Sequence, residues 1–284
     1  MHDNSPSPEI YWVVGDGTGV GKTTISCALI RALNRAGIPA AGFKPYAATL
    51  LAEGIAFLAA GATRSPSRLH GEDALRLVEA SPLTSVEMLD VVACAQFLCH
   101  SRWPGAVMAR TGAEVLGNAE YFRSDDATLA QERYDLRALL AKTGLPFAGA
   151  KPAGALDFFR APALSPEKQK PAFEFLARLG AAALVCEGAG RFIPNWQDCP
   201  GVNHVICIAE GRVTFFPRAN VKVTFSPDGP LGPVAGLAAY LERSDKRRHY
   251  ASLHYVADPG QRNAAADRIV LEMLRMSGGR AIPD

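Results

Sequence analysis

Near the start of the chain, hydrophobic positions form two short continuous runs with a longer stretch of helical spacing between them. Ile10–Val14 is continuously apolar and rich in β-branched and aromatic residues, which predicts a buried strand. Apolar residues then recur at helical spacing from Thr23 to Ala36, and Gly37 ends the predicted helix. Ala40–Phe43 predicts a second strand. A strand, a helix and a strand joined by short connections predict a βαβ unit and therefore a parallel sheet.

Later segments continue to mix helical and strand patterns. Glu87–Leu98 is ambiguous between the two, and residues 102–149 mix polar and apolar positions, so we expect helices on the flank of the sheet there. His204–Phe225 alternates around Glu210-Gly211, which predicts a hairpin. Further helices are predicted at Asp73–Ala80, Pro166–Leu179, Val234–Arg243 and Ala264–Met276, and further strands at Ala182–Cys186 and Leu253–Ala257.

A composition of 48% hydrophobic and 20% charged residues is that of an ordinary soluble globular protein. The net charge of +2 gives no argument for a nucleic-acid or membrane surface, so neither is expected as a partner. The six cysteines contain no CxxC pair and no His or Cys cluster completes a zinc site, which indicates reduced thiols in a cytoplasmic protein. The polar start of the chain lacks the apolar core of a signal peptide, and no apolar run is long enough for a transmembrane helix.

The stretch GDGTGVGKTT joins the first strand to the first helix and carries the clearest chemical signal. Its glycines let backbone N–H groups fold around an anion, and the positive N-terminal end of the helix points at the same place. Lys22 supplies a charge for the β- and γ-phosphates of a nucleotide, and Thr23 offers a hydroxyl to Mg²⁺. Asp16 stands where the common phosphate-loop spacing has its first glycine, so this is a longer variant loop. The candidate nucleotide-binding residues are Gly17, Gly19, Val20, Gly21, Lys22, Thr23 and Thr24, and the candidate catalytic residues of the loop are Lys22 and Thr18.

Three further charged side chains stand beside predicted elements. Lys44 follows the second strand at the carboxyl end, which is the ligand-binding edge of a parallel sheet, and Pro45 fixes its exit. Glu187 follows the strand Ala182–Cys186, where a carboxylate can hold Mg²⁺ directly or through water. Asp73 stands at the start of a predicted helix. Each also has a plain structural interpretation, namely a solvated lysine, a carboxylate bonded to a turn and a helix N-cap.

No linker divides the chain, so we expect one α/β domain over residues 1–284, a P-loop NTPase-like parallel sheet flanked by helices. The region from about residue 100 to 165 is interpreted as an insertion, and the hairpin around residues 206–223 as an addition to the sheet. Residues 1–8 and 277–284 are expected to be loose tails.

Four motifs occur in an order that resembles dethiobiotin synthetase, an ATP-dependent carboxylase: the phosphate loop, FKPYA, EDAL and CEGAGRF. The resemblance implies that Lys22 and Lys44 hold phosphate and a carbamate, and that Thr23, Asp73 and Glu187 gather around Mg²⁺. It also places Asp258, in HYVADPGQR, near the nucleotide base. The implied reactants are ATP, an amine or diamine and CO₂ or bicarbonate, and the implied assembly is a homodimer.

The sequence departs from the family where the family holds the tail of its substrate. Pro230 and Ala235 stand at positions that are polar there, so an arginine of the hairpin, Arg212 or Arg218, is a candidate substitute for binding a carboxylate. Two other functions remain open. One is an amidoligase similar to cobyrinate synthetases, which activate a carboxylate, and the other is a regulatory P-loop ATPase without turnover.

Overall fold

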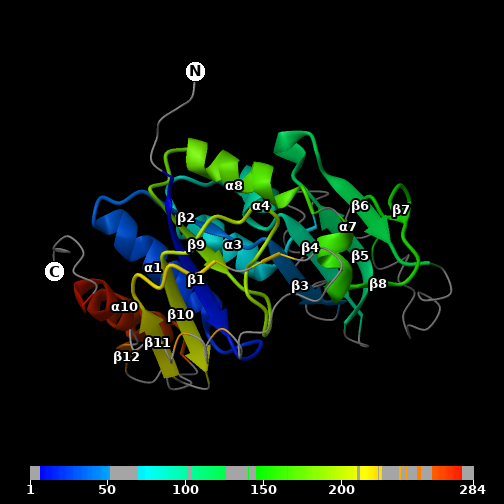
Figure 1. Cartoon of the computed structure of the whole chain (residues 1–284). Coiled ribbons are helices and arrows are strands. Elements are labelled where there is room, and N and C mark those ends of the chain that lie inside the picture. Colours follow the sequence, from blue (N-terminus) through cyan, green and yellow to red (C-terminus); the bar gives the residue numbers. More distant parts are fainter. Residues whose placement is uncertain are drawn as a thin grey trace.

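The computed structural model describes residues 7–51, 69–100, 104–125, 140, 145–164, 166–209, 212–222, 224–225, 237, 241, 248–250 and 258–276. Two β-sheets lie side by side, with helices packed around them (Figure 1). Several predicted segments fall outside these residues. They are the strand Leu253–Ala257, the tail 277–284, all but the last two residues of the tail 1–8, and all but Leu237 and Leu241 of the helix Val234–Arg243.

The first sheet contains the strands β1 (Glu9–Gly15), β2 (Ala40–Phe43), β9 (Ala183–Glu187), β10 (His204–Ala209), β11 (Arg212–Phe216) and β12 (Arg248–Tyr250). Their order is β12-β11-β10-β1-β9-β2. The βαβ prediction is confirmed, because β1 and β2 both run parallel to β9, which lies between them. The hairpin is also confirmed, since β10 pairs antiparallel with β11. With β12 added antiparallel to β11, the sheet is mixed rather than wholly parallel.

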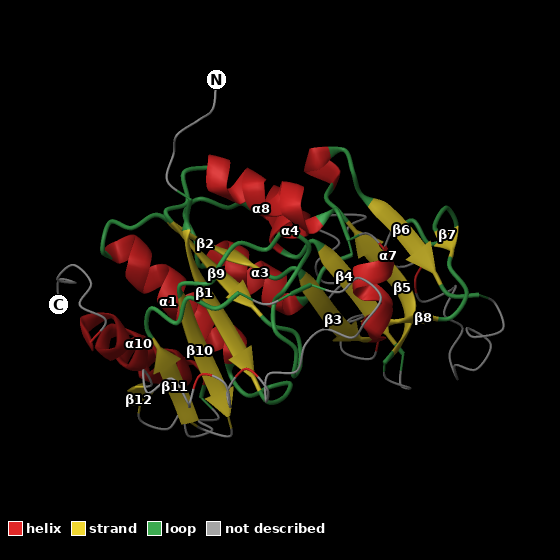
Figure 2. Cartoon of the chain, in the orientation of Figure 1, coloured by secondary structure: helices red, strands yellow, loops and turns green. Residues whose placement is uncertain are grey.

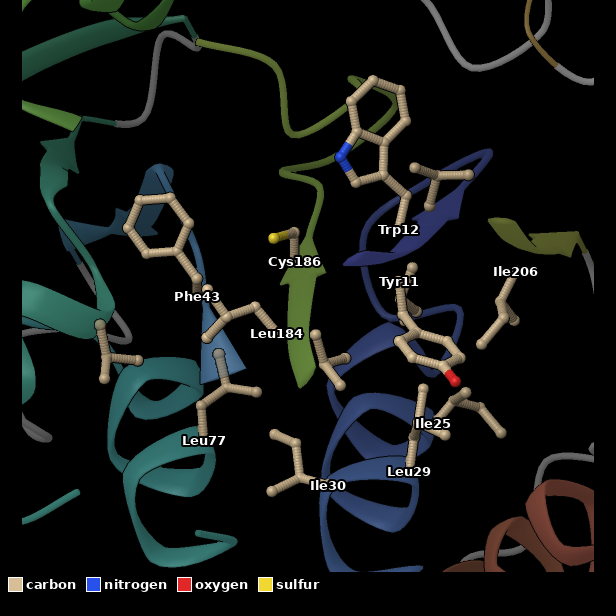
Figure 3. Close-up of a cluster of buried hydrophobic side chains, with 14 of the residues drawn as sticks. Tyr11, Trp12, Ile25, Leu29, Ile30, Phe43, Leu77, Leu184, Cys186 and Ile206 are labelled. Carbon is tan, nitrogen blue, oxygen red and sulfur yellow. The ribbon is translucent and has the colours of Figure 1, made fainter. Parts of the chain in front are cut away.

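Helices cover both faces of the first sheet. The helices α1 (Lys22–Arg35) and α3 (Glu72–Glu79) lie on one face, where Ile25, Leu29 and Leu77 point toward the strands (Figure 3). The C-terminal helix α10 (Pro259–Met276) packs against α1. On the other face, Phe43 meets Phe173 of α8 (Gln169–Arg178) at a ring-centroid distance of 6.2 Å. The four predicted helices that fall within the described residues are therefore confirmed, with ends that differ by at most five residues.

The second sheet was not predicted. Its strands are β3 (Tyr46–Leu50), β4 (Ala95–Cys99), β5 (Gly105–Thr111), β6 (Glu120–Arg123), β7 (Lys151–Pro152) and β8 (Leu156–Asp157), in the order β3-β4-β5-β6-β7 with β8 paired to β5 (Figure 2). The expectation of helices on the sheet's flank over residues 102–149 is therefore wrong for β5 and β6. The ambiguous segment Glu87–Leu98 holds most of a short 3-10 turn (Val86–Met88), then the short helix α4 (Leu89–Val92) and most of β4.

Only two residues, Lys44 and Pro45, separate β2 of the first sheet from β3 of the second. The Lys44 N–H donates to the carbonyl of Val92 at 2.7 Å, and the Pro45 carbonyl accepts from the Ala95 N–H at 3.0 Å. A single buried hydrophobic cluster contains residues of both sheets. Phe158, which follows β8, links the second sheet to the turn after β9, with ring-centroid distances of 5.6 Å to Phe97 and 6.0 Å to Phe192. The two sheets therefore share this core, and the other face of the second sheet packs in a separate buried cluster with Leu98, Val107 and Met108.

The cysteines are free, as the sequence predicts, and all except the half-buried Cys199 are buried. Burial raises the pKa of the Cys27 and Cys99 thiols to about 12, so neither is a thiolate at neutral pH. Among the described residues, no helix is both long and apolar enough to cross a membrane.

Candidate active site

The phosphate loop connects β1 to α1, as predicted. Gly19 and Gly21 have φ angles of 75° and 101°, in the left-handed region that a side chain strongly disfavours. A Cβ at Gly15 would lie 2.7 Å from the side chain of Val20, so the start of the loop also requires glycine. No side chain caps the start of α1. The loop and the helix start therefore present backbone N–H groups in the manner of an anion site.

Lys22 reaches across the loop instead of into solvent. Its ammonium donates to the carbonyl of Gly17 and, at 3.0 Å, to the carbonyl of Gly190 in the turn after β9. Burial lowers the pKa of Lys22, and the nearby carboxylate of Glu187 opposes this effect. The phosphate loop and the EGAG turn are thus held together by the lysine that the sequence assigns to phosphate.

Lys44 and Glu187 meet because their strands are in register. Phe43 of β2 is paired with Cys186 of β9, so the next residue of each strand, Lys44 and Glu187, leaves the sheet at the same edge. The Nζ of Lys44 lies 2.8 Å from Oε1 of Glu187, and both side chains are almost completely buried. Lys44 is therefore not a solvated surface charge.

Asp73 and Thr23 complete the group. Asp73 lies in the first turn of α3, whose N-cap is Gly71, so the N-cap interpretation of Asp73 is wrong. Its Oδ2 lies 2.5 Å from Nζ of Lys44. The hydroxyl oxygen of Thr23 lies 2.8 Å from Oδ1 of Asp73 and 2.9 Å from Oε1 of Glu187. Glu187 thus bonds to two side chains of the site through Oε1, and it is more than a turn residue.

Electrostatics keep Lys44 and Asp73 charged at neutral pH. Burial alone would favour a neutral Lys44, but the carboxylates of Asp73 and Glu187 outweigh it and raise the pKa of Lys44 above its ordinary value. The charge of Lys44 lowers the pKa of Asp73 from 3.8 to about 2, against a smaller opposing effect of burial. The site is a buried ammonium between two carboxylates.

The donors suit Mg²⁺. In the described part of the chain, no group of three or more His, Cys, Asp or Glu side chains could hold a metal ion. Thr23, Asp73 and Glu187 instead offer one hydroxyl and two carboxylates, which are the hard oxygen ligands that Mg²⁺ prefers. The second carboxylate oxygen of Glu187, Oε2, is buried and has no hydrogen-bond partner among the described residues. A buried carboxylate oxygen without a donor fits a cation that binds there.

Two other candidates stand at the margin of the site. Thr18 is exposed at the tip of the loop, about 4.0 Å from where a Cβ of Gly190 would lie. Asp258 immediately precedes α10, and its Oδ1 accepts from the Gln261 N–H at 2.8 Å. Asp258 therefore caps a helix in this structure, and its role at a nucleotide base stays a prediction.

Sequence analysis missed two contributors. Gly190 supplies the carbonyl that accepts from Lys22, and the quoted EGAG motif already contained it. Arg76 lies one turn after Asp73 on α3 and donates to the hydroxyl of Thr24 at 3.3 Å. The spacing of three residues between Asp73 and Arg76, which places both on one helix face, was the signal for Arg76.

The two hairpin arginines lie at opposite ends of the strands of the first sheet. Arg212 is paired with Ala209 at the end of β10, and the neighbouring Ile208 accepts from the Asp16 N–H of the phosphate loop at 3.1 Å. Arg218 follows β11, and its N–H donates to Nδ1 of His204 at the start of β10. Arg212 therefore lies at the end of the strands next to the phosphate loop, and Arg218 lies at the opposite end.

Comparison with known proteins supports a distant relationship to one group of enzymes. The chain is 34% identical over 123 residues to an ATP-dependent dethiobiotin synthetase of Phenylobacterium zucineum. The matched stretch covers 40% of this chain and 46% of the relative. It is 40% identical over 73 residues to the Escherichia coli enzyme, and 35% identical over 81 residues to that of Alteromonas mediterranea. These two matches cover 26% and 28% of this chain and 27% and 30% of the relatives. The chain thus matches less than half the length of each relative. No known family pattern matches it.

Proposed function

We propose that this chain is an ATP- and Mg²⁺-dependent ligase that forms a carbamate on an amine or diamine and phosphorylates it. The observation that carries the proposal is the meeting of Lys44, Asp73, Glu187 and Thr23 beside the phosphate loop. A simple nucleotide-binding loop needs Lys22 and Thr23 but has no need of a second buried lysine. The partial similarity to ATP-dependent dethiobiotin synthetases supports the same class of reaction.

In the proposed reaction, an amine nitrogen of the substrate attacks CO₂, forms a C–N bond and loses a proton to give a carbamate. A carbamate oxygen then attacks the γ-phosphorus of ATP, and ADP leaves. A second amine of a diamine attacks the carbonyl carbon and loses a proton, the C–O bond to phosphate breaks, phosphate leaves, and a cyclic urea forms. A bound Mg²⁺ would supply charge neutralisation at the phosphates. The protein contributes position and charge, because these steps need no covalent enzyme intermediate.

Each residue has a defined part in this proposal. Lys22, released from Gly17 and Gly190, would bind the β- and γ-phosphates together with the N–H groups of the loop. Lys44 would bind the carbamate, since its ammonium lies at the same edge of the sheet. Thr23, Asp73 and Glu187 would hold the metal. Arg212, at this edge, is the candidate for an acid group of the substrate.

The test is phosphate release from ATP in the presence of diaminopelargonate and bicarbonate. The proposed reaction predicts that phosphate release needs both an amine and bicarbonate. Several diamines should be tested, because the residues expected to hold the tail of the substrate differ from those of the family. Release that needs a carboxylate and ammonia, and is indifferent to bicarbonate, would instead identify an amidoligase. Nucleotide binding without release under any of these conditions would identify a regulatory ATPase.

A further inference from the structure

The carboxylates assigned to the metal already carry a cation. The ammonium of Lys44 lies 2.5 Å from Oδ2 of Asp73 and 2.8 Å from Oε1 of Glu187. The hydroxyl of Thr23 touches the same two carboxylates at 2.8 and 2.9 Å. The lysine charge is therefore placed among the oxygens that would bind Mg²⁺.

A metal ion bound at Glu187 would lie next to this ammonium. Oε1 of Glu187 accepts from Lys44 and also contacts Thr23, so a metal bound to it would face the ammonium directly. The side chain of Lys44 is 4% exposed and that of Glu187 is fully buried. Water therefore screens the repulsion between two cations poorly at this place. A metal ion at these carboxylates would therefore repel the ammonium.

We propose that Lys44 is the resident counter-ion of a divalent-cation site, and that an arriving metal displaces its ammonium from Asp73 and Glu187 and frees it for an anionic group of the substrate. This inference rests on the proposed function, because it uses the same metal site. It adds a rule for the order of events: the metal, with its nucleotide, must bind before an anionic substrate can take up Lys44.

The local geometry permits the exchange. The side chain of Asp73 is 43% exposed, so a metal can enter from its side, although Glu187 is buried. Oε2 of Glu187, which has no hydrogen-bond partner among the described residues, gives the metal an oxygen that Lys44 does not use. The backbone N–H of Lys44 is held by Val92, so the exchange needs rotation of the flexible side chain only.

Binding of Mn²⁺ alone, with free ion measured by electron paramagnetic resonance, tests the competition. Mn²⁺ uses the same oxygen ligands as Mg²⁺. At about pH 8, Lys44→Met should bind Mn²⁺ about tenfold or more tightly than the wild type, because the competing charge is gone. Lys170→Met is the matched control, since Lys170 is exposed and paired with Asp198 at 3.3 Å. An unchanged or weaker affinity in folded Lys44→Met would overturn the proposal, as would an equal gain in the control.

A crystal structure of the wild type with Mg²⁺ alone gives a second test that does not depend on a variant folding. The metal is expected at Asp73 and Glu187, with Nζ of Lys44 beyond hydrogen-bond distance, roughly 3.2 Å or more, from at least Oε1 of Glu187. Metal at these carboxylates with both lysine contacts intact contradicts the displacement. The absence of metal there at saturating Mg²⁺ contradicts it too.

Failure of this inference and failure of the proposed function give different results. Tighter Mn²⁺ binding in Lys44→Met, without carbamate-dependent phosphate release from the wild type, supports the counter-ion and rejects the ligase. Carbamate-dependent release together with unchanged Mn²⁺ affinity in Lys44→Met supports the ligase and rejects the counter-ion.

Discussion

The ammonium of Lys22 and the carbonyl of Gly190 are 3.0 Å apart, although 168 residues separate them in the chain. The bond closes the phosphate loop against the turn that carries Glu187. In the proposed function a nucleotide takes Lys22 away from this carbonyl, so the turn and the loop would respond together when phosphate binds. Several of the following predictions use this relationship or the group of charges next to it.

Lys22→Ala should lose ATP affinity by at least about tenfold, because a charge-assisted bond to phosphate contributes about 1.5–3 kcal/mol. Calorimetric titration with ATP measures the change, and circular dichroism checks the fold. Lys170→Ala is the control for the loss of one positive charge, since Lys170 lies on α8 and pairs with Asp198. Equal ATP affinity in folded Lys22→Ala and wild type would reject the loop as the nucleotide site.

Glu187→Gln should reduce Mg²⁺-dependent ATP turnover by about tenfold or more, because a neutral amide cannot balance a divalent cation. The dependence of turnover on Mg²⁺ concentration should shift to higher concentrations in the same variant. Steady-state phosphate release over a Mg²⁺ series measures both. If neither value moves in a folded variant, the carboxylate has no part in metal binding.

Gly188→Ala should destabilise the protein by about 2 kcal/mol or more through a backbone clash. A Cβ at Gly188 would lie 2.2 Å from the carbonyl oxygen of Phe192, so the turn after β9 cannot keep its path. Gly201→Ala is the matched control, because nothing lies within 4 Å of a Cβ there. Thermal unfolding should show a lower Tm for Gly188→Ala only; similar shifts in the two variants would contradict the explanation.

Arg212→Ala and Arg218→Ala should affect substrate binding differently, because the two arginines lie at opposite ends of the strands. If the substrate carries an acid group, Arg212→Ala should raise KM for it by about tenfold, and Arg218→Ala should leave KM unchanged. Kinetics with the best amine found in the phosphate-release assay measures both values. A larger effect at Arg218 would mean that the substrate binds at the other edge.

The lowered pKa of Asp73 predicts that the protein loses part of its folding stability in acid. Its pKa is lowered from 3.8 to about 2 by Lys44, so its contribution is present above about pH 4 and is lost as the pH falls toward about 2. Urea unfolding at pH 7, 4 and 3 should show a drop below pH 4 in the wild type that is smaller in Asp73→Asn. Identical acid profiles would show that the ion pair does not contribute.

The ligand edge could be predicted because it follows from strand order. Lys44 and Glu187 each stand one residue after an apolar strand, and parallel strands bring such positions to one edge. Asp73 could be picked out from its motif. Its position in the first turn of α3, instead of at the N-cap, became clear only from the structure. The Glu210-Gly211 hairpin followed from alternation alone.

The second sheet could not be read in the same way. β4 and β5 are buried on both faces, so neither shows the alternation that marks a half-exposed strand. Arg110 gave no local signal either. It is fully buried on β5 and bonds to the carbonyls of Leu69, Ala93 and Cys94, among others, which are contacts set by tertiary packing.

The two-residue connection from β2 to β3 has a mechanical consequence. Pro45 has a fixed φ, and the carbonyl of Val92 and the N–H of Ala95 hold the connection on both sides, so it contains almost no slack. A shift of β3 and β4 relative to the first sheet would therefore pull directly on the backbone of Lys44. Any molecule that moved the second sheet on binding would therefore also move the ammonium of Lys44.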